Sequence, residues 1–220
     1  MNTAFKIFLA ASVVVPVAAY AQSAQGPTTT LPSVYISKED IAKISATEQN
    51  QYTRDENARV VDIGPGNFEL GIVHRKSTHT PPPARPAGAN AAAAAQRQPC
   101  GVQVDTVPAD ARKGALTHDF QSEGYLITSG GGTMFLDGHI VNGRNGMSET
   151  PGGPNGPTCG GIAVGSHTVV VKAGDVIVVP VAAVHGWADI PDHVDYMTFR
   201  YSTKNTMQSG WVNPTIANGK

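Results

Sequence analysis

The chain has little charge and no excess of either sign. Only 15% of its 220 residues are charged, and the formal net charge is −1. A near-neutral chain gives no electrostatic reason to expect nucleic acid as a partner. Beyond the first 21 residues no apolar run is long enough to cross a bilayer, so no membrane span is expected in the mature chain. Glycine and proline are abundant, with 24 and 16 residues, which favours a turn-rich β protein.

The N-terminus has the pattern of a secretory signal. Lys6 precedes an apolar run from Ile7 to Tyr20, and small residues flank the expected cleavage after Ala21. We therefore expect an exported protein, periplasmic or secreted. Cysteine is scarce, and its two residues, Cys100 and Cys159, fit one disulfide in an oxidising compartment. Two unpaired thiols are the alternative.

Four segments are expected along the chain. They are a signal peptide (1–21), a leader with a short helix capped by Ser37 (22–58), one barrel (59–205) and a C-terminal tail (206–220). Two stretches within the barrel segment hold little that could form a core. The Pro- and Ala-rich stretch 80–99 is predicted to be a mobile insertion, and the Gly- and Pro-rich stretch 142–161 a second insertion.

Short segments with period-two alternation follow from Arg59 onward, separated by turn residues, and they predict a sandwich or a barrel. In the strand expected over 68–75 one face is apolar and is predicted to point inward; it consists of Phe68, Leu70, Ile72 and His74. In the strand expected over 194–202 the face with Met197, Phe199 and Tyr201 is the more apolar. Arg200, on the opposite face, is therefore expected at the surface.

Two segments place histidines in chemically informative company. His118 is followed by Glu123 and Gly130, and a turn over 119–122 would let the His118 and Glu123 side chains converge. Later, an apolar strand runs from Gly174 to Pro180, and His185 opens the next strand. The remaining histidines lie among turn residues and are expected to be solvated; they are His79, His139, His167 and His193.

These two segments together resemble the motifs of the cupin superfamily, which comprises small β-barrels with a metal site inside. His118, Glu123 and Gly130 match the spacing of the last three landmarks of the first cupin motif, and Gly174, Pro180 and His185 match the second. The chain departs from the pattern at Leu116, where the family has another histidine. The resemblance implies an all-β, cupin-like (jelly-roll) barrel.

The resemblance also implies one divalent metal ion, held by His118, Glu123 and His185. Zinc, iron, manganese, nickel or copper suits two imidazoles and a carboxylate. His74 is the candidate for the vacant fourth position or for the pocket lining. Strand alternation places Tyr125 and Trp187 on the inward face as pocket residues. The alternatives are buried histidines without a metal and ordinary core aromatics.

The favoured function is a metal-dependent enzyme that acts on a small organic molecule inside the barrel, with dioxygenase or lyase/isomerase chemistry. A non-catalytic, extracytoplasmic protein that binds a small molecule or a metal is the alternative. A homodimer is compatible with both. Outside the cytoplasm the intrinsic order of metal affinities favours zinc or copper over iron.

Overall fold

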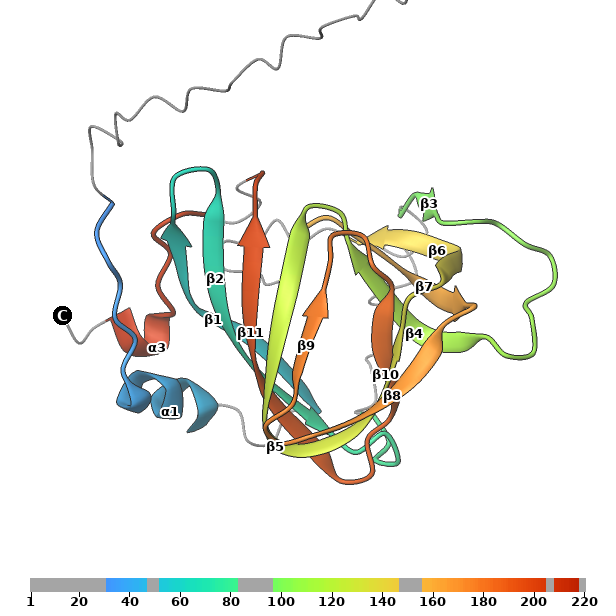
Figure 1. Cartoon of the computed structure of the whole chain (residues 1–220), viewed down its shortest axis with the longest axis horizontal. Helices are drawn as coiled ribbons and strands as arrows, with labels where there is room; N and C mark the ends of the chain where they lie inside the picture. The colour runs from blue at the N-terminus through green and yellow to red at the C-terminus, as the bar shows by residue number, and fades with distance from the viewer. Residues whose placement is uncertain (1–30, 47–51, 83–96, 147–155, 205–207, 218–220) are drawn as a thin grey trace, which may run out of the picture. The chain divides into compact units, whose positions relative to one another are not determined.

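The computed structural model describes residues 31–46, 52–82, 97–146, 156–204 and 208–217, which are mostly β-strand (Figure 1). Two helices flank the strands, α1 (Lys38–Ala46) and α3 (Pro214–Ala217). The strands are β1 (Thr53–Asp62), β2 (Asn67–Lys76), β3 (Pro99–Cys100), β4 (Arg112–His118), β5 (Gln121–Leu136), β6 (His139–Gly146), β7 (Thr158–Val164), β8 (His167–Lys172), β9 (Val176–Val179), β10 (His185–Asp189) and β11 (His193–Ser202).

Several predicted segment boundaries compare directly with these elements. β1 begins ahead of the barrel boundary expected at residue 59. β6 and β7 extend into the insertion expected at 142–161, and the tail expected at 206–220 contains α3. The signal peptide 1–21 lies outside the described residues, as do residues 83–96 of the first insertion and 147–155 of the second. Those predictions stay predictions.

One long strand, β5, joins two antiparallel sheets. Its first part pairs with β11 and β9, in a sheet ordered β1-β2-β11-β5-β9 that we name the helix-covered sheet. Its second part pairs with β8 and β10, in a sheet that continues through β4, β7, β6 and β3. The predicted all-β, jelly-roll type of barrel is confirmed by this topology.

Glycine allows β5 to pass from one sheet to the other. Gly130 has a φ of +64°, and a Cβ there would collide with the carbonyl oxygen of His193 on the adjoining strand. An L side chain rarely adopts this conformation, whereas glycine adopts it at no steric cost. Gly131 follows directly and pairs with Lys172 of β8, in the second sheet.

Helix α1 begins with the predicted cap. Ser37 Oγ accepts a hydrogen bond from the backbone N–H of Asp40 at 3.0 Å, and the Asp40 carboxylate accepts one from the Ser37 N–H at 3.4 Å. This reciprocal pair satisfies two N–H groups that the helix itself leaves without partners. Ile44 of α1 then packs with Ile216 of α3 against the outer face of the helix-covered sheet.

Because the helices bury that outer face, the predicted orientations of β2 and β11 are wrong. Leu70 and Ile72 of β2 pack outside the barrel in the cluster that contains Ile44, and Met197 and Phe199 of β11 pack against the same cluster. The residues in between point inward. Val73 of β2 and Tyr196 of β11 both belong to the interior core.

The predicted disulfide is confirmed. Cys100 of β3 and Cys159 of β7 are bonded, with their Cα atoms 6.0 Å apart. The bond crosses from β3 to β7 past β6, which pairs with both strands. It thereby connects the end of the 80–99 stretch to the 142–161 stretch.

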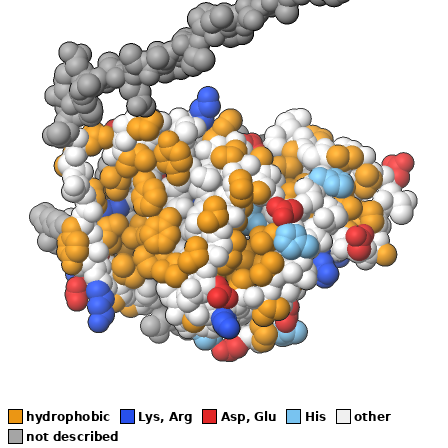
Figure 2. Space-filling model, in the orientation of Figure 1, with side chains coloured by type: hydrophobic (Ala, Val, Ile, Leu, Met, Phe, Trp, Pro, Cys, Tyr) orange, Lys and Arg blue, Asp and Glu red, His pale blue; other side chains and the backbone are white. Residues whose placement is uncertain are grey.

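Apolar side chains also occur on the outer surface. Val170 of β8 and Val176 and Val178 of β9 are each more than half exposed, and Figure 2 shows hydrophobic side chains spread over the face seen in Figure 1. The expected homodimer stays a prediction. Among the described residues no helix is both long and apolar enough to cross a membrane.

Candidate metal centre

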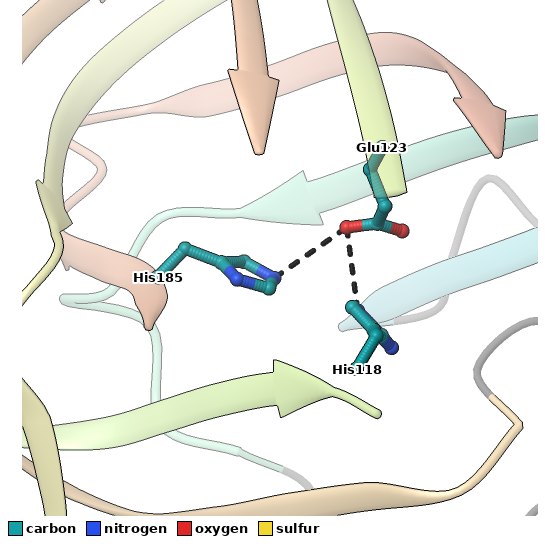
Figure 3. A group of neighbouring side chains, drawn as sticks. All are labelled: His118, Glu123 and His185. Carbon is teal, nitrogen blue, oxygen red and sulfur yellow. Dashed lines mark ion pairs between the residues drawn. The ribbon is translucent and has the colours of Figure 1, made fainter. Parts of the chain in front are cut away.

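Three polar side chains converge inside the barrel. His118 is the last residue of β4, Glu123 lies near the start of β5, and His185 is the first residue of β10 (Figure 3). The short turn between β4 and β5 lies within the predicted 119–122 segment and brings His118 and Glu123 together. The backbone N–H of Ala182 donates to the His118 carbonyl at 2.9 Å, which connects the segment preceding His185 to the end of β4.

The spacing of the three side chains suits one metal ion. Glu123 Oε2 lies 3.3 Å from His118 Nε2 and 3.5 Å from His185 Nε2, and one ligand atom from each residue lies within 4.8 Å of the others. Two ligands held by one metal at about 2.1 Å, at tetrahedral or octahedral angles, lie roughly 3.0–3.5 Å apart. All three side chains are buried. The three residues could therefore hold a metal ion.

The hydrogen bond of His185 determines which ring nitrogen is available as a ligand. Its Nδ1 lies 3.1 Å from the carbonyl oxygen of Ala183. A carbonyl only accepts, so Nδ1 carries the proton and the neutral ring presents the Nε2 lone pair to Glu123. Burial lowers the pKa of His185, which favours this neutral ring. Two acceptors thus face each other inside a buried site, an arrangement that a cation would satisfy.

Glu123 is held in its charged form. Burial by itself would raise its pKa, but the Arg200 guanidinium and the two histidines outweigh burial and hold the pKa well below its ordinary value. Arg200 Nε donates to Glu123 Oε1 at 2.6 Å, and the Tyr125 hydroxyl donates to Oε2 at 2.6 Å. Burial and the Glu123 charge raise the pKa of Tyr125, so that its hydroxyl remains a donor. Such hydrogen bonds orient metal-ligating carboxylates.

Arg200 is buried, so the prediction of a surface residue is wrong. Only 1% of it is exposed, and its guanidinium also binds both oxygens of Asp55 at 2.8 and 3.0 Å. Gly71 on the neighbouring strand leaves room for the guanidinium, since a Cβ there would lie 2.7 Å from Arg200 Nη1. Arg200 was predicted at the surface because its face of the strand was taken as external. Asp55 was missed because residues 22–58 were assigned to the leader, whereas β1 begins at Thr53.

A second buried carboxyl group lies beside this ion-pair network. Glu69, on the inward face of β2, accepts hydrogen bonds from Gln121 Nε2 at 2.7 Å and from Asn57 Nδ2 at 3.2 Å. Burial raises its pKa to about 7, although the nearby Arg200 charge acts in the opposite direction.

His74 lies outside the barrel interior, so its predicted place in the pocket or at the metal is wrong. Its Nδ1 pairs with Asp195 at 2.5 Å on the outer face of the helix-covered sheet, and it lines a separate hollow together with Ile41 of α1. Alternation was read correctly for β2, but the wrong face was taken as internal. Among the remaining histidines, His79, His139 and His167 are exposed, whereas His193 is half-buried.

A cavity of about 510 Å³ opens onto the triad. Tyr125 and Trp187 line it, as does Leu116, whose side chain has no ligand atom. The Tyr196 ring packs between the other two aromatic rings, 4.8 Å from Tyr125 and 5.9 Å from Trp187. The cavity therefore has the triad at one part of its wall and an aromatic surface at another.

Comparison with known proteins finds distant structural likenesses. No family model and no curated protein sequence matches this chain. A recombinant oxalate oxidase in complex with glycolate is 12% identical with a TM-score of 0.32, covering 71% of this chain and 54% of its own. A cupin-like protein from Thermotoga maritima is 12% identical, with a TM-score of 0.31. The match covers 76% of this chain and 79% of that protein. Peruvianin-I, a cysteine peptidase from Thevetia peruviana latex, is 8% identical, with a TM-score of 0.34. The match covers 81% of this chain and 93% of that protein.

The chain spans about half the length of that oxalate oxidase, and likenesses at this level carry nothing about activity. The strand topology and the motif positions define the class of fold instead. Two antiparallel sheets joined through one long strand form a jelly-roll type of β-barrel, with His118, Glu123 and His185 inside it.

Proposed function

We propose that the chain binds one divalent metal ion through His118 Nε2, Glu123 Oε2 and His185 Nε2 and acts there on a small organic molecule. The observation that carries the proposal is the buried contact between His185 Nε2 and Glu123 Oε2 at 3.5 Å. Both atoms are acceptors in the tautomer that the Ala183 carbonyl imposes. A divalent cation supplies the positive charge that this pair lacks.

Three protein ligands leave further positions on a metal for substrate. A bound divalent metal would act as a Lewis acid on a substrate oxygen, and a redox-active one would also support dioxygenase chemistry. Leu116 keeps the fourth family position free of a protein ligand. Arg200 and Tyr125 hold the Glu123 carboxylate in place, and the cavity of about 510 Å³ suits a small molecule. Lyase or isomerase chemistry fits the same arrangement.

One observation favours a binding protein without catalysis as the second candidate. Among the described residues that line the cavity, the two carboxylates are Asp55 and Glu123, and both bind Arg200. Neither is free to act as a general base. Substrate turnover by the metal-loaded protein, as opposed to binding alone, separates the two candidates.

We also propose that the protein is exported from the cytoplasm. The Cys100–Cys159 disulfide supports an oxidising compartment. A chain that folds there acquires its metal outside the cytoplasm, where intrinsic affinity favours zinc or copper over iron. Zinc is accordingly the metal to test first.

The test is the metal content of substituted proteins. After loading with zinc and exhaustive dialysis, elemental analysis should find about one zinc per chain in the unsubstituted protein. His118→Ala, Glu123→Ala and His185→Ala should each lose most of it, because each removes one of three ligands. The matched controls are His79→Ala and His139→Ala, at exposed histidines, which should keep it. Full zinc occupancy in a Glu123→Ala, His185→Ala double variant would overturn the proposal.

A further inference from the structure

An arginine that no carboxylate binds directly lines the cavity. Arg75 points inward from β2, and its Nε donates to the Tyr196 hydroxyl at 2.8 Å. Within the described part of the chain this is its only side-chain hydrogen bond, and it forms no ion pair with a carboxylate. The two Nη groups therefore remain available to a ligand. A partly buried cation is most favourable when a counter-charge accompanies it.

The two carboxylates that line the cavity bind Arg200 and not Arg75. Asp55 and Glu123 both bind Arg200, so these three residues together carry one net negative charge. Arg75 balances that charge. A divalent metal at the triad would make the cavity strongly positive. Such a cavity attracts an anion.

An aromatic surface connects Arg75 to the triad. Tyr196, which holds Arg75, packs 4.8 Å from Tyr125, and the Tyr125 hydroxyl contacts Glu123. Trp187 packs on the other side of Tyr196, with 5.9 Å between the ring centroids. A molecule bound at Arg75 would therefore extend along these rings towards the metal ligands.

On the basis of the proposed function, we propose that the substrate is a small organic carboxylate. Its carboxylate pairs with the Nη groups of Arg75, its body lies against Tyr196 and Trp187, and its reacting end is directed towards the triad. The planar guanidinium matches a carboxylate through two parallel hydrogen bonds. Phosphate is a second anion that arginine binds, and the experiment separates the two.

Trp187 provides a direct readout of binding. The sequence has two tryptophans, so Trp211→Phe leaves Trp187, in the cavity lining, as the only one. Zinc-loaded Trp211→Phe protein is titrated with benzoate, with the neutral isostere benzamide and with inorganic phosphate. Fluorescence and calorimetry then give three dissociation constants. Benzoate should bind at least 10-fold more tightly than benzamide, because a charge-assisted hydrogen bond contributes about that much, and more tightly than phosphate.

Variants in the same background assign the effect to Arg75. Arg75→Gln should weaken benzoate about 10- to 100-fold while zinc content stays at one per chain. Arg75→Lys should have an intermediate dissociation constant for benzoate, because lysine keeps the charge and loses the paired donors. Tyr196→Phe should weaken benzoate several-fold, since it frees the Arg75 side chain. Arg112→Gln, at an exposed arginine of β4, is the matched control and should leave the benzoate affinity and the zinc content unchanged.

The outcomes distinguish this inference from the proposed function. A protein that retains no zinc refutes the metal centre. Zinc-loaded protein that binds benzoate and benzamide alike, or an Arg75→Gln variant that binds benzoate as Arg112→Gln does, refutes the carboxylate subsite. Tighter binding of phosphate than of benzoate also refutes the assignment to a carboxylate.

Discussion

Glu69→Gln should change how the stability of this protein depends on pH. Glu69 is completely buried on the inward face of β2, where it accepts hydrogen bonds from Gln121 and Asn57. Burial raises its pKa from 4.5 to about 7. The folded protein therefore keeps a proton on Glu69 at pH values where the unfolded chain has lost it. Glutamine has nearly the same shape and does not titrate.

The direction in which Glu69 changes the stability with pH follows from its raised pKa in the folded protein. The stability contributed by protonated Glu69 is fully present below pH 4.5 and is lost as pH rises to about 7. The shift corresponds to about 3.5 kcal/mol, at roughly 1.4 kcal/mol per pKa unit, of which about 2.5 kcal/mol falls between pH 5 and pH 8. From pH 5 to pH 8 the stability of Glu69→Gln should therefore rise by about 2.5 kcal/mol relative to that of the unsubstituted protein.

Urea unfolding at pH 5 and pH 8, in the presence of a chelator, measures this difference without any contribution from bound metal. Comparing two proteins at each pH cancels all other titrating groups. Glu39→Gln, at an exposed glutamate in the first turn of α1, is the matched control and should show no such trend. A stability difference between Glu69→Gln and the unsubstituted protein that is equal at both pH values within about 0.5 kcal/mol would refute the reasoning.

Three further predictions concern the ion-pair network and the disulfide. Arg200→Met should lower the free energy of unfolding by about 3–5 kcal/mol in urea titrations, because it leaves two carboxylates without their cation; a loss below about 1 kcal/mol would contradict the network's role. Gly71→Ala should destabilise by about 1–3 kcal/mol, since its Cβ would collide with the Thr198 hydroxyl and the Arg200 guanidinium, whereas Gly124→Ala, with only ordinary contacts, should be nearly neutral in the same assay. Replacing Cys100 and Cys159 by serine should cost up to roughly 4 kcal/mol, given their separation of 59 residues; an unchanged urea midpoint would argue against this.

Motif spacing predicted the triad because its three residues lie at or near the ends of strands. His118 and Glu123 lie on either side of one tight turn, so their proximity is set by a few residues. His185 follows Pro180 at a strand start for a similarly local reason. Such short-range relations can be read from sequence, whereas the pairing of β4 with β10 needs the whole barrel.

Alternation predicted which residues share a face but not which face is internal. Leu70 and Ile72 are apolar because α1 and α3 cover the outside of their sheet. Glu69 and Arg200 pair in register on β2 and β11 and both lie inside the barrel, where polar partners bind them. Gln121 and Asn57 bind Glu69, and two carboxylates bind Arg200. The rule that the apolar face points into the barrel therefore failed for both strands. Arg75 was missed for the same reason.

The most direct test of the metal centre is a crystal structure of the zinc-loaded protein, with diffraction data collected on both sides of the zinc absorption edge. One anomalous peak is expected inside the barrel, about 2.0–2.2 Å from His118 Nε2, Glu123 Oε2 and His185 Nε2. A zinc-loaded crystal without a peak at these three atoms, or with its peak at the outer-face pair of His74 and Asp195, would contradict it.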